Sequence, residues 1–531
     1  MGLVLALVIG TTAVSAVSRK VGIPPPIALV VAGILASLIP GLPDYQLDPE
    51  LVLVGFLPPL LYAEAIDTSL QDLRANLRPI ALLSVGLVLA TTVAVGYTAH
   101  LLIPGLPLAA GFMLGAIVAP PDAVAATAIA HRVGLPRRVI SILEGESLLN
   151  DATALVAYRI AVAAVLTGAF SYREAVLRFV VVSAVGVAVG LGVGFLVVTV
   201  RRRIDDPLTE NTVSLITPFA AYLPAEALHG SGVLAVVVAG LVVARAAPLI
   251  VSSTTRLQGQ AVWEVIAFVL QGIVFALIGL QLRQILAGLH GYRPADLAWY
   301  AGLITVAVIV VRIVWVFPAA YLPRLLFPHV RAREPSLSWR SPAIVSWAGM
   351  RGVVSLAAAF AVPLAAGTGP FPDRDLILFL TFAVIVATLL LQGLTLPWVG
   401  RRLRITGLPD ETSALHQAAA EHTTARLALV RLDQIVTRGA LPADVEQRLR
   451  RDLEERARRA HAILGPDADD EHLPELVNGA VVAAASYTEA RQELLRLERT
   501  ETVRMWNRGE IDDQALAALQ RRFDLEEQQI I

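Results

Sequence analysis

The stretch EGESLLNDA, from Glu144 to Ala152, places three carboxylates and an asparagine inside a long apolar region. The sequence VISI lies just before it, and the run ALVAYRIAVAAVLTGAF follows it. A charged side chain at the centre of a membrane helix costs about 2.5–3.5 kcal/mol, and residues kept at that cost are functional by default. This stretch therefore indicates both the class of fold and the position of a site.

The composition of the whole chain supports a membrane protein. The 531 residues are 56% hydrophobic and 16% charged, and the mean hydropathy is +0.66, whereas ordinary soluble chains have about 25% charged residues. A soluble protein of this size could not bury so much apolar side chain, so we expect a polytopic membrane protein. The net charge of −1 gives no indication of a nucleic-acid partner, and the lack of cysteine excludes disulfides and thiolate metal sites.

Thirteen stretches have the length and apolar character of a membrane-spanning helix, which needs about 20 mainly apolar residues. They lie near residues 2–18, 23–40, 49–66, 79–103, 107–130, 138–168, 176–200, 211–228, 231–250, 260–282, 296–322, 342–366 and 375–399. The first has no basic segment before it, so we interpret it as a span and not as a cleaved signal.

The basic residues predict the orientation of these spans. With the N-terminus outside, nineteen Lys and Arg residues fall in inside loops and five in outside loops. Cytoplasmic loops are the basic ones. We therefore expect the N-terminus outside, the C-terminus in the cytoplasm, and the protein in the cell (inner) membrane.

The composition changes near residue 401. Segments such as DVEQRLRRDLEERARRAHAIL are charged and have the periodicity of amphipathic helices. We predict a transmembrane domain over 1–400 and a cytoplasmic helical domain over 401–531. The pattern of the second domain is typical of a solvated helical bundle, and a role in regulation or dimer contact is the alternative.

Helical spacing sorts the polar residues of the opening stretch. Ser147 and Asp151 are four residues apart and share one face of a helix. Glu146 and Asn150 are also four apart, on a stripe about 100° round. One stripe offers a carboxylate with a hydroxyl, and the other offers an amide with a carboxylate that could pair with a basic residue.

Two other predicted spans are interrupted. Pro120 and Pro121 precede Asp122 and cannot continue a regular helix, while Arg351 stands beside Gly352 in a later span. Interruptions in corresponding places of the two halves predict inverted repeats with a site near the midplane. Asp122 could neutralise the positive ends of the half-helices and Arg351 the negative ends.

Six motifs together resemble the monovalent cation:proton antiporter family of the CPA1 type, which includes bacterial and eukaryotic Na⁺/H⁺ exchangers. They are GESLLND, APPDAVA (119–125), FALIGLQL (275–282), GMRGVVSL (349–356), LPPLLYAEA (57–65) and AYLPAEALHGSGVLAVVVAG (221–240). The resemblance extends over roughly residues 1–400, with the motifs in the order of the family. The resemblance implies an all-α transporter with about 13 transmembrane helices, two broken helices that cross near the midplane, and a homodimer in the lipid bilayer. It also implies that no cofactor is used, because the transported Na⁺ and H⁺ are the only ligands.

The resemblance assigns roles to the site residues. Asp151 would be the carboxylate that binds Na⁺ or H⁺ but not both, with the Ser147 hydroxyl and the Pro121 carbonyl as further Na⁺ ligands. Asn150 stands where electrogenic relatives have a second aspartate, which implies electroneutral exchange. Glu146 would form a structural ion pair with Arg312, and Asp122 and Arg351 would lie at the crossing of the broken helices.

Two positions depart from the family pattern. Relatives often have threonine before the aspartate, where this chain has Pro121, so a hydroxyl ligand is lost while the carbonyl survives. Relatives also often have an acid directly after the aromatic residue of the LPP motif. Here Ala63 takes that place and Glu64 is one residue on, which rotates its side chain by about 100°. We therefore favour a structural role for Glu64 near the span end, with ligation as the alternative.

Three other functions are alternatives for a chain with these features. K⁺/H⁺ exchange is the nearest, and Li⁺ is a further possible ion, because ion choice depends on fine cavity size. An intramembrane aspartyl protease would need Asp122 and Asp151 as paired carboxylates, but the GxGD element typical of those enzymes is missing from both positions. A cation channel would need a filter of carbonyl groups, for which the chain has no motif. We therefore expect a transporter and not an enzyme.

Overall fold

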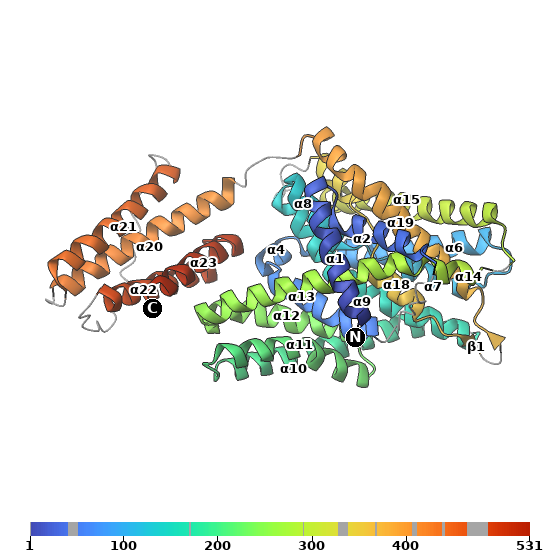
Figure 1. The fold of residues 1–531 in the computed structure, drawn as a ribbon, viewed down its shortest axis with the longest axis horizontal. Helices are drawn as coiled ribbons and strands as arrows, with labels where there is room; N and C mark the ends of the chain where they lie inside the picture. Colours follow the sequence, from blue (N-terminus) through green and yellow to red (C-terminus); the bar gives the residue numbers. More distant parts are fainter. Residues whose placement is uncertain are drawn as a thin grey trace.

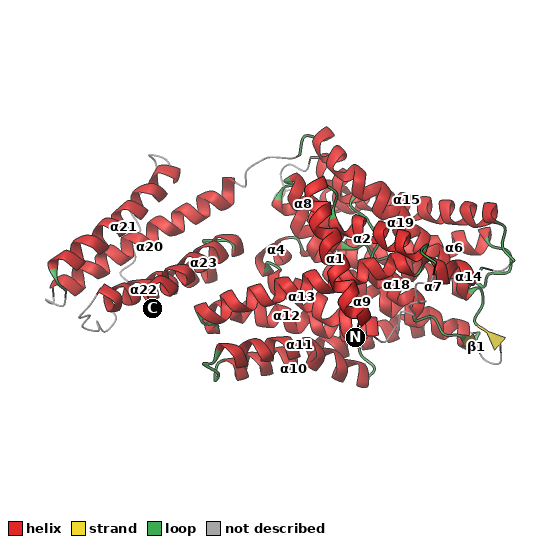
Figure 2. Cartoon of the chain, viewed as in Figure 1, coloured by secondary structure: helices red, strands yellow, loops and turns green. Residues whose placement is uncertain are grey.

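The computed structural model describes residues 2–40, 51–168, 171–289, 291–327, 338–366, 369–405, 411–437, 441–464 and 487–530. Helices make up nearly all of the described chain (Figure 2). One large bundle contains the helices up to α19, and the last four helices form a separate group beside it, drawn in orange to red (Figure 1). We call this group, residues 411–530, the tail.

The bundle follows the apolar pattern of the sequence. Its elements are α1 (Gly2–Val21), α2 (Pro25–Ser37), the π-helical η1 (Leu51–Phe56), α3 (Leu57–Asp67), α4 (Leu70–Ala75), α5 (Leu77–Ala81), the π-helical η2 (Leu82–Leu87), α6 (Val88–Leu102), α7 (Leu108–Val118), α8 (Ala123–Val133), α9 (Arg137–Thr167), α10 (Tyr172–Arg201), α11 (Pro207–Ala227), α12 (Gly232–Ile250), α13 (Ser253–Leu280), α14 (Leu282–Ala287), α15 (Pro294–Leu326), α17 (Arg340–Trp347), α18 (Val353–Phe360) and α19 (Arg374–Arg402). Two strands of two residues each, β1 (Ala365–Ala366) and β2 (Gly369–Pro370), pair antiparallel before α19.

Among the described residues, seven helical stretches are long and apolar enough to cross a membrane. They are Leu77–Leu102, Arg137–Thr167, Arg173–Arg201, Gly232–Ile250, Ser253–Ala287, Pro294–Leu326 and Arg374–Arg402. Each predicted span coincides with one helix or with a run of shorter helical segments. The predicted multi-pass helical architecture is confirmed, while the count of thirteen stays a prediction.

The bundle packs around two main apolar clusters. The larger cluster takes most of its buried side chains from α6, α7, α8, α15, α18 and α19, together with the start of α9. The smaller cluster takes its side chains mainly from α3, α11 and α12. Two helices contribute to both clusters: α9 through Leu143 and Leu148, and α13 through Phe275 and Trp263. The clusters therefore define two packing units that meet along α9 and α13.

The tail consists of α20 (Glu411–Thr437), α21 (Ala443–Leu464), α22 (Tyr487–Arg508) and α23 (Asp513–Ile530). Its apolar side chains form two clusters of their own, and every member of both belongs to the tail. Ion pairs add to them: Arg456 and Arg491 both approach the buried Glu498, at 3.3 and 3.6 Å. Burial raises the pKa of Glu498, and the two arginines oppose that shift.

Candidate functional site

The two helix breaks lie against each other in the larger packing unit. The first break separates α7 from α8 and contains Pro120 and Pro121, and the second separates α17 from α18. The backbone N–H of Asp122 donates a hydrogen bond of 2.7 Å to the carbonyl of Met350. At both breaks, backbone groups lose the hydrogen bonds that a continuous helix would give them. The contact between the breaks replaces hydrogen bonds that neither helix can make.

Gly352 allows this close approach. A Cβ atom at Gly352 would lie 1.7 Å from Oδ2 of Asp122, so no other residue fits without movement of the backbone. The other carboxylate oxygen of Asp122 accepts from the N–H of Ala125 at 3.4 Å, in the first turn of α8. The carboxylate therefore lies at the positive end of a half-helix, where negative charge is favoured.

Arg351 occupies the opposite kind of position. Its side chain is fully buried, and Nη1 donates to the carbonyl of Gly349 at 3.1 Å, just past the end of α17. Its backbone N–H donates to the hydroxyl of Thr388 at 3.1 Å. The guanidinium therefore meets a carbonyl at the negative end of a half-helix. Its Nε and Nη2 have no hydrogen-bond partner among the described residues.

A buried ion pair joins α9 to α15. Glu146 accepts from Nη1 and Nη2 of Arg312 at 2.5 and 2.8 Å, and both side chains are about 1% exposed. The Nε of Arg312 donates to the carbonyl of Val345 in α17 at 3.2 Å. Because removing one partner of such a pair leaves a buried charge unpaired, this contact fixes α9 to the larger packing unit.

Asn150 connects α9 to the first break. Its side-chain Nδ2 donates to the carbonyl of Pro121 at 3.0 Å, and the residue is fully buried. A carbonyl oxygen has two lone pairs. The Pro121 carbonyl is thus held in place by the amide and keeps one lone pair for another ligand.

A small cavity of about 50 Å³ lies between the two packing units and is lined by Glu64, Pro121, Asp122, Ser147, Asp151 and Gly352 among others. A cavity needs only about 10–15 Å³ of such space to hold one water molecule, so this cavity has room for a small ion together with water. Asp151 is 5% exposed and Ser147 is 6% exposed. The structure thus brings together a carboxylate, a hydroxyl and a backbone break around one small buried cavity whose wall is otherwise mainly apolar.

A family model described as "Sodium/hydrogen exchanger, transmembrane" matches residues 3–402. The chain belongs to the sodium/hydrogen exchanger family. The family transports monovalent cations and protons, and the protein is a multi-pass membrane transporter and not an enzyme. The resemblance found in the motifs is therefore confirmed.

Individual relatives agree with this assignment. An uncharacterised Na⁺/H⁺ exchanger of Mycobacterium tuberculosis is 38% identical to this chain, and the alignment spans 100% of this chain and 95% of the relative. A sodium, potassium, lithium and rubidium/H⁺ antiporter of Bacillus subtilis is 38% identical over 71% of this chain and 57% of its own. The sodium proton antiporter MjNhaP1 of Methanocaldococcus jannaschii shares the fold, with a TM-score of 0.60 and 18% identity over 76% of this chain and 98% of its own.

The wall of the small cavity includes Glu64, for which the sequence favoured a structural role with ligation as the alternative, and Gln271, which the sequence interpretation did not name. Glu64 lies on the cavity wall with Asp151, although the offset from Ala63 favoured a role near the span end. The signal for this position was present, because Leu57, Leu60 or Leu61, and Glu64 repeat at the spacing of one helix face. Gln271 of α13 also lines the cavity and was missed. It is a lone amide in the apolar run FVLQGIVF, and that interruption was the available signal.

Proposed function

We propose that the protein is a secondary active transporter that exchanges Na⁺ for H⁺ at Asp151 by alternating access. The observation that carries the proposal is the small cavity in which Asp151, Ser147 and the Pro121–Asp122 break meet. Midplane sites of this kind are built where discontinuous helices cross between repeats. The basic residues of the loops support an orientation in the inner membrane with the N-terminus outside and the C-terminus in the cytoplasm.

Burial explains why the two ions would compete. A carboxylate in a buried space is costly unless its charge is compensated. Either a proton on Asp151 or a Na⁺ beside it removes that cost, so the carboxylate does not need both at once. For Na⁺ the oxygen ligands would be the Asp151 carboxylate, the Ser147 hydroxyl, the remaining lone pair of the Pro121 carbonyl, and water. Glu64 is available as a further oxygen ligand.

The proposed stoichiometry is one H⁺ for one Na⁺. Asn150 is neutral in both loading states, and its side-chain amide donates a hydrogen bond to the Pro121 carbonyl. The amide therefore adds no second charge to the exchange, and one proton on Asp151 replaces one Na⁺. Asp122 and Arg351 compensate the half-helix ends, and Glu146 with Arg312 holds α9 in register.

K⁺/H⁺ exchange is the second candidate. It is favoured by the Bacillus subtilis relative, whose name includes potassium, lithium and rubidium beside sodium. The same carboxylate chemistry serves each of these ions. The choice between them would follow from the fit of the ion to the small cavity.

Purified protein in liposomes with a pH-sensitive dye inside tests the function. Na⁺, Li⁺ and K⁺ are added separately to the wild type, Asp151→Asn and Glu174→Gln; Glu174 is an exposed carboxylate of α10 and serves as the matched control. We expect cation-driven alkalinisation or acidification in the wild type and the control, and none in Asp151→Asn. Exchange that persists in Asp151→Asn would remove this residue from the mechanism, and the order of the three ions ranks the two candidates.

A further inference from the structure

One neutral polar side chain on the wall of the small cavity has no role in the exchange proposed above. Gln271 of α13 lines this cavity together with Asp151, Ser147 and Pro121. Between residues 265 and 280 it is the only residue that is neither apolar nor glycine. An amide in apolar surroundings is unfavourable unless it finds a hydrogen-bond partner or a ligand, so its position beside the carboxylate needs a cause.

The protein itself does not hold the amide of Gln271. In the described part of the chain, no hydrogen bond or ion pair engages this side chain, and the residue is half-buried. Phe275 lies one turn further along the same face of α13, is buried, and also lines the cavity. This face of α13 therefore brings a fixed aromatic ring and an unbonded amide to the ion site.

The backbone of α13 is fixed on both sides of Gln271. Trp263 donates from Nε1 to the hydroxyl of Ser214 in α11 at 3.1 Å, and its ring lies 5.2 Å from that of Tyr62 in α3. Gly279 packs so closely on α2 that a Cβ atom there would overlap the backbone of that helix. Trp263 and Gly279 each lie eight residues from Gln271. The amide can therefore change its place mainly by rotation of its own side chain.

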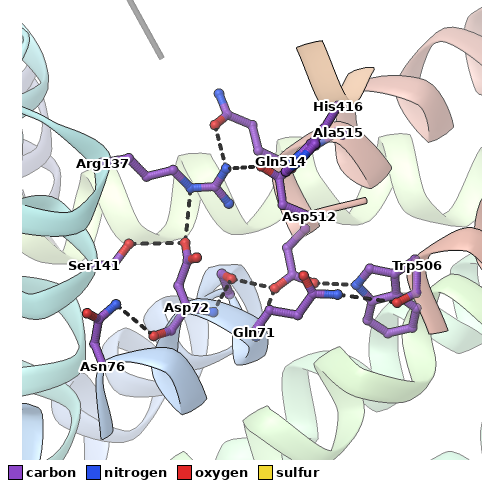
Figure 3. A network of polar contacts seen from close by, with 12 residues as sticks. Gln71, Asp72, Asn76, Arg137, Ser141, His416, Trp506, Asp512, Gln514 and Ala515 are labelled. Carbon is purple, nitrogen blue, oxygen red and sulfur yellow. Dashed lines mark hydrogen bonds and ion pairs between the residues drawn. The ribbon is translucent and has the colours of Figure 1, made fainter. Parts of the chain in front are cut away.

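The part of the wall that α9 forms is fixed as well. The bonds of Glu146 and Asn150 described above hold the middle of this helix. At its start, Arg137 donates to Asp72 of α4 at 3.0 Å and to Asp512 of the tail at 2.7 Å (Figure 3). The carboxylate and the hydroxyl of the site therefore stand on a helix that is bonded at its start and at its middle.

Cations of different size need different sets of ligands. Carboxylate and amide oxygens both bind hard cations, and a larger cation takes more ligands at longer distances. Carbonyl oxygens are able to replace the hydration shell of K⁺. Because the helices around the small cavity are fixed, a larger ion gains an additional oxygen most readily from a side chain that is free to rotate.

We infer that Gln271 is a specificity-determining residue of the ion site, whose side-chain oxygen binds K⁺ and so extends the range of cations that the protein exchanges. The smaller Na⁺ is bound by the Asp151 carboxylate, the Ser147 hydroxyl, the Pro121 carbonyl and water, without the amide. The inference rests on the proposed function, because it concerns the cation that replaces H⁺ at Asp151.

Titration of exchange with each ion tests this role. Gln271→Leu removes the amide, and Gln271→Asn keeps it on a side chain that is shorter by one CH₂ group. Wild type and variants are assayed in liposomes with a pH-sensitive dye, and the concentrations of Na⁺ and K⁺ for half-maximal exchange are compared. In Gln271→Leu we expect the K⁺ value to rise about tenfold, which corresponds to about 1.4 kcal/mol, and the Na⁺ value to change by about twofold or less. Gln271→Asn should lie between the wild type and Gln271→Leu.

A second measurement reports ion binding without transport. A ligand that binds the folded protein raises its unfolding temperature, so thermal unfolding in detergent is followed with NaCl or KCl, and with choline chloride at the same ionic strength. We expect Gln271→Leu to lose the stabilisation by K⁺ and to keep that by Na⁺. Gln258→Leu is the matched control in both assays, since Gln258 is an exposed amide of the same helix outside the small cavity.

The outcomes separate this inference from the proposed function. An unchanged ratio of the K⁺ and Na⁺ values in Gln271→Leu would overturn the specificity role, and so would an equal loss for both ions. A wild type that exchanges Na⁺ but neither exchanges nor binds K⁺ would overturn this inference alone. No exchange of any ion by the wild type would contradict the proposed function, and the unfolding measurement would still decide whether Gln271 binds K⁺.

Discussion

The side-chain amide of Asn150 donates to the carbonyl oxygen of Pro121 over 3.0 Å, so α9 is bonded directly to the break between α7 and α8. An amide can make this bond in every loading state, whereas an aspartate can make it only while protonated. The residue at 150 therefore holds the break in place, and under the proposed mechanism it also sets the number of charges that change during a cycle.

Asn150→Asp is expected to make exchange sensitive to membrane voltage. The new carboxyl would release its proton as Na⁺ binds, so more than one proton would be exchanged for each cation. The measurement is the exchange rate in liposomes under imposed K⁺ diffusion potentials of both signs. Asn150→Ala, which removes the hydrogen bond without adding charge, is the control, and a voltage response in the wild type itself would contradict one-for-one exchange.

Glu146→Gln is expected to lower stability by about 3–5 kcal/mol, because Arg312 is left as an unpaired buried charge. A double change, Glu146→Leu with Arg312→Met, is expected to recover most of that loss, since a buried pair can be replaced by apolar residues. Thermal unfolding in detergent measures both. Arg159→Leu breaks a pair with Glu226 in which Arg159 is 45% exposed, and is expected to cost about 1 kcal/mol or less. If Glu146→Gln and Arg159→Leu lowered stability by the same amount, the buried pair would not contribute more to stability than the exposed pair.

Gly352→Ala is expected to abolish exchange, because its Cβ would overlap the Asp122 carboxylate and push the two breaks apart. Gly10→Ala in α1 is the matched control, since a Cβ there meets no atom within 4 Å. Dye-reported exchange and the yield of folded protein are compared for the two variants. Wild-type exchange in a well-folded Gly352→Ala protein would show that the breaks tolerate separation.

Glu64→Gln is expected to raise the Na⁺ concentration for half-maximal exchange about tenfold, the effect of losing about 1.4 kcal/mol of ion binding. The reason is its position on the wall of the small cavity. Titration of exchange with Na⁺ measures the change, with Glu264→Gln on the exposed face of α13 as the control. An unchanged Na⁺ dependence would assign Glu64 a structural role, as its offset from the family position suggested.

The sequence was sufficient for the features that depend on local pattern. Long apolar runs predict the helices, and the pair Pro120–Pro121 and the glycine beside Arg351 predict the breaks, because both act on the backbone where they stand. The spacing of Glu146 and Asn150 also shows that they share a stripe of α9.

Features that depend on packing between distant elements could not be predicted from the sequence. The contact between Asp122 and Met350 joins two breaks more than 200 residues apart, and no local periodicity encodes that distance. The same applies to the docking of Asp512 on Arg137, which joins residues 375 positions apart. Glu64 is the third case. Its offset of one residue from the family motif favoured a structural role, whereas Leu57, Leu60 and Leu61 mark the helix face that lines the small cavity together with Glu64.

Arg351 has a consequence for leakage through the protein. Its guanidinium is fully buried beside Gly352, and two of its nitrogen atoms have no hydrogen-bond partner among the described residues. A fixed arginine charge in a narrow pathway is a barrier to cations, as in selective pores. Under the proposed function, a Na⁺ in the small cavity, whose wall includes the neighbouring Gly352, would be repelled by this charge unless a carboxylate such as Asp151 held it. We expect this buried charge to prevent uncoupled ion flow and so to preserve the ion gradients on which exchange depends.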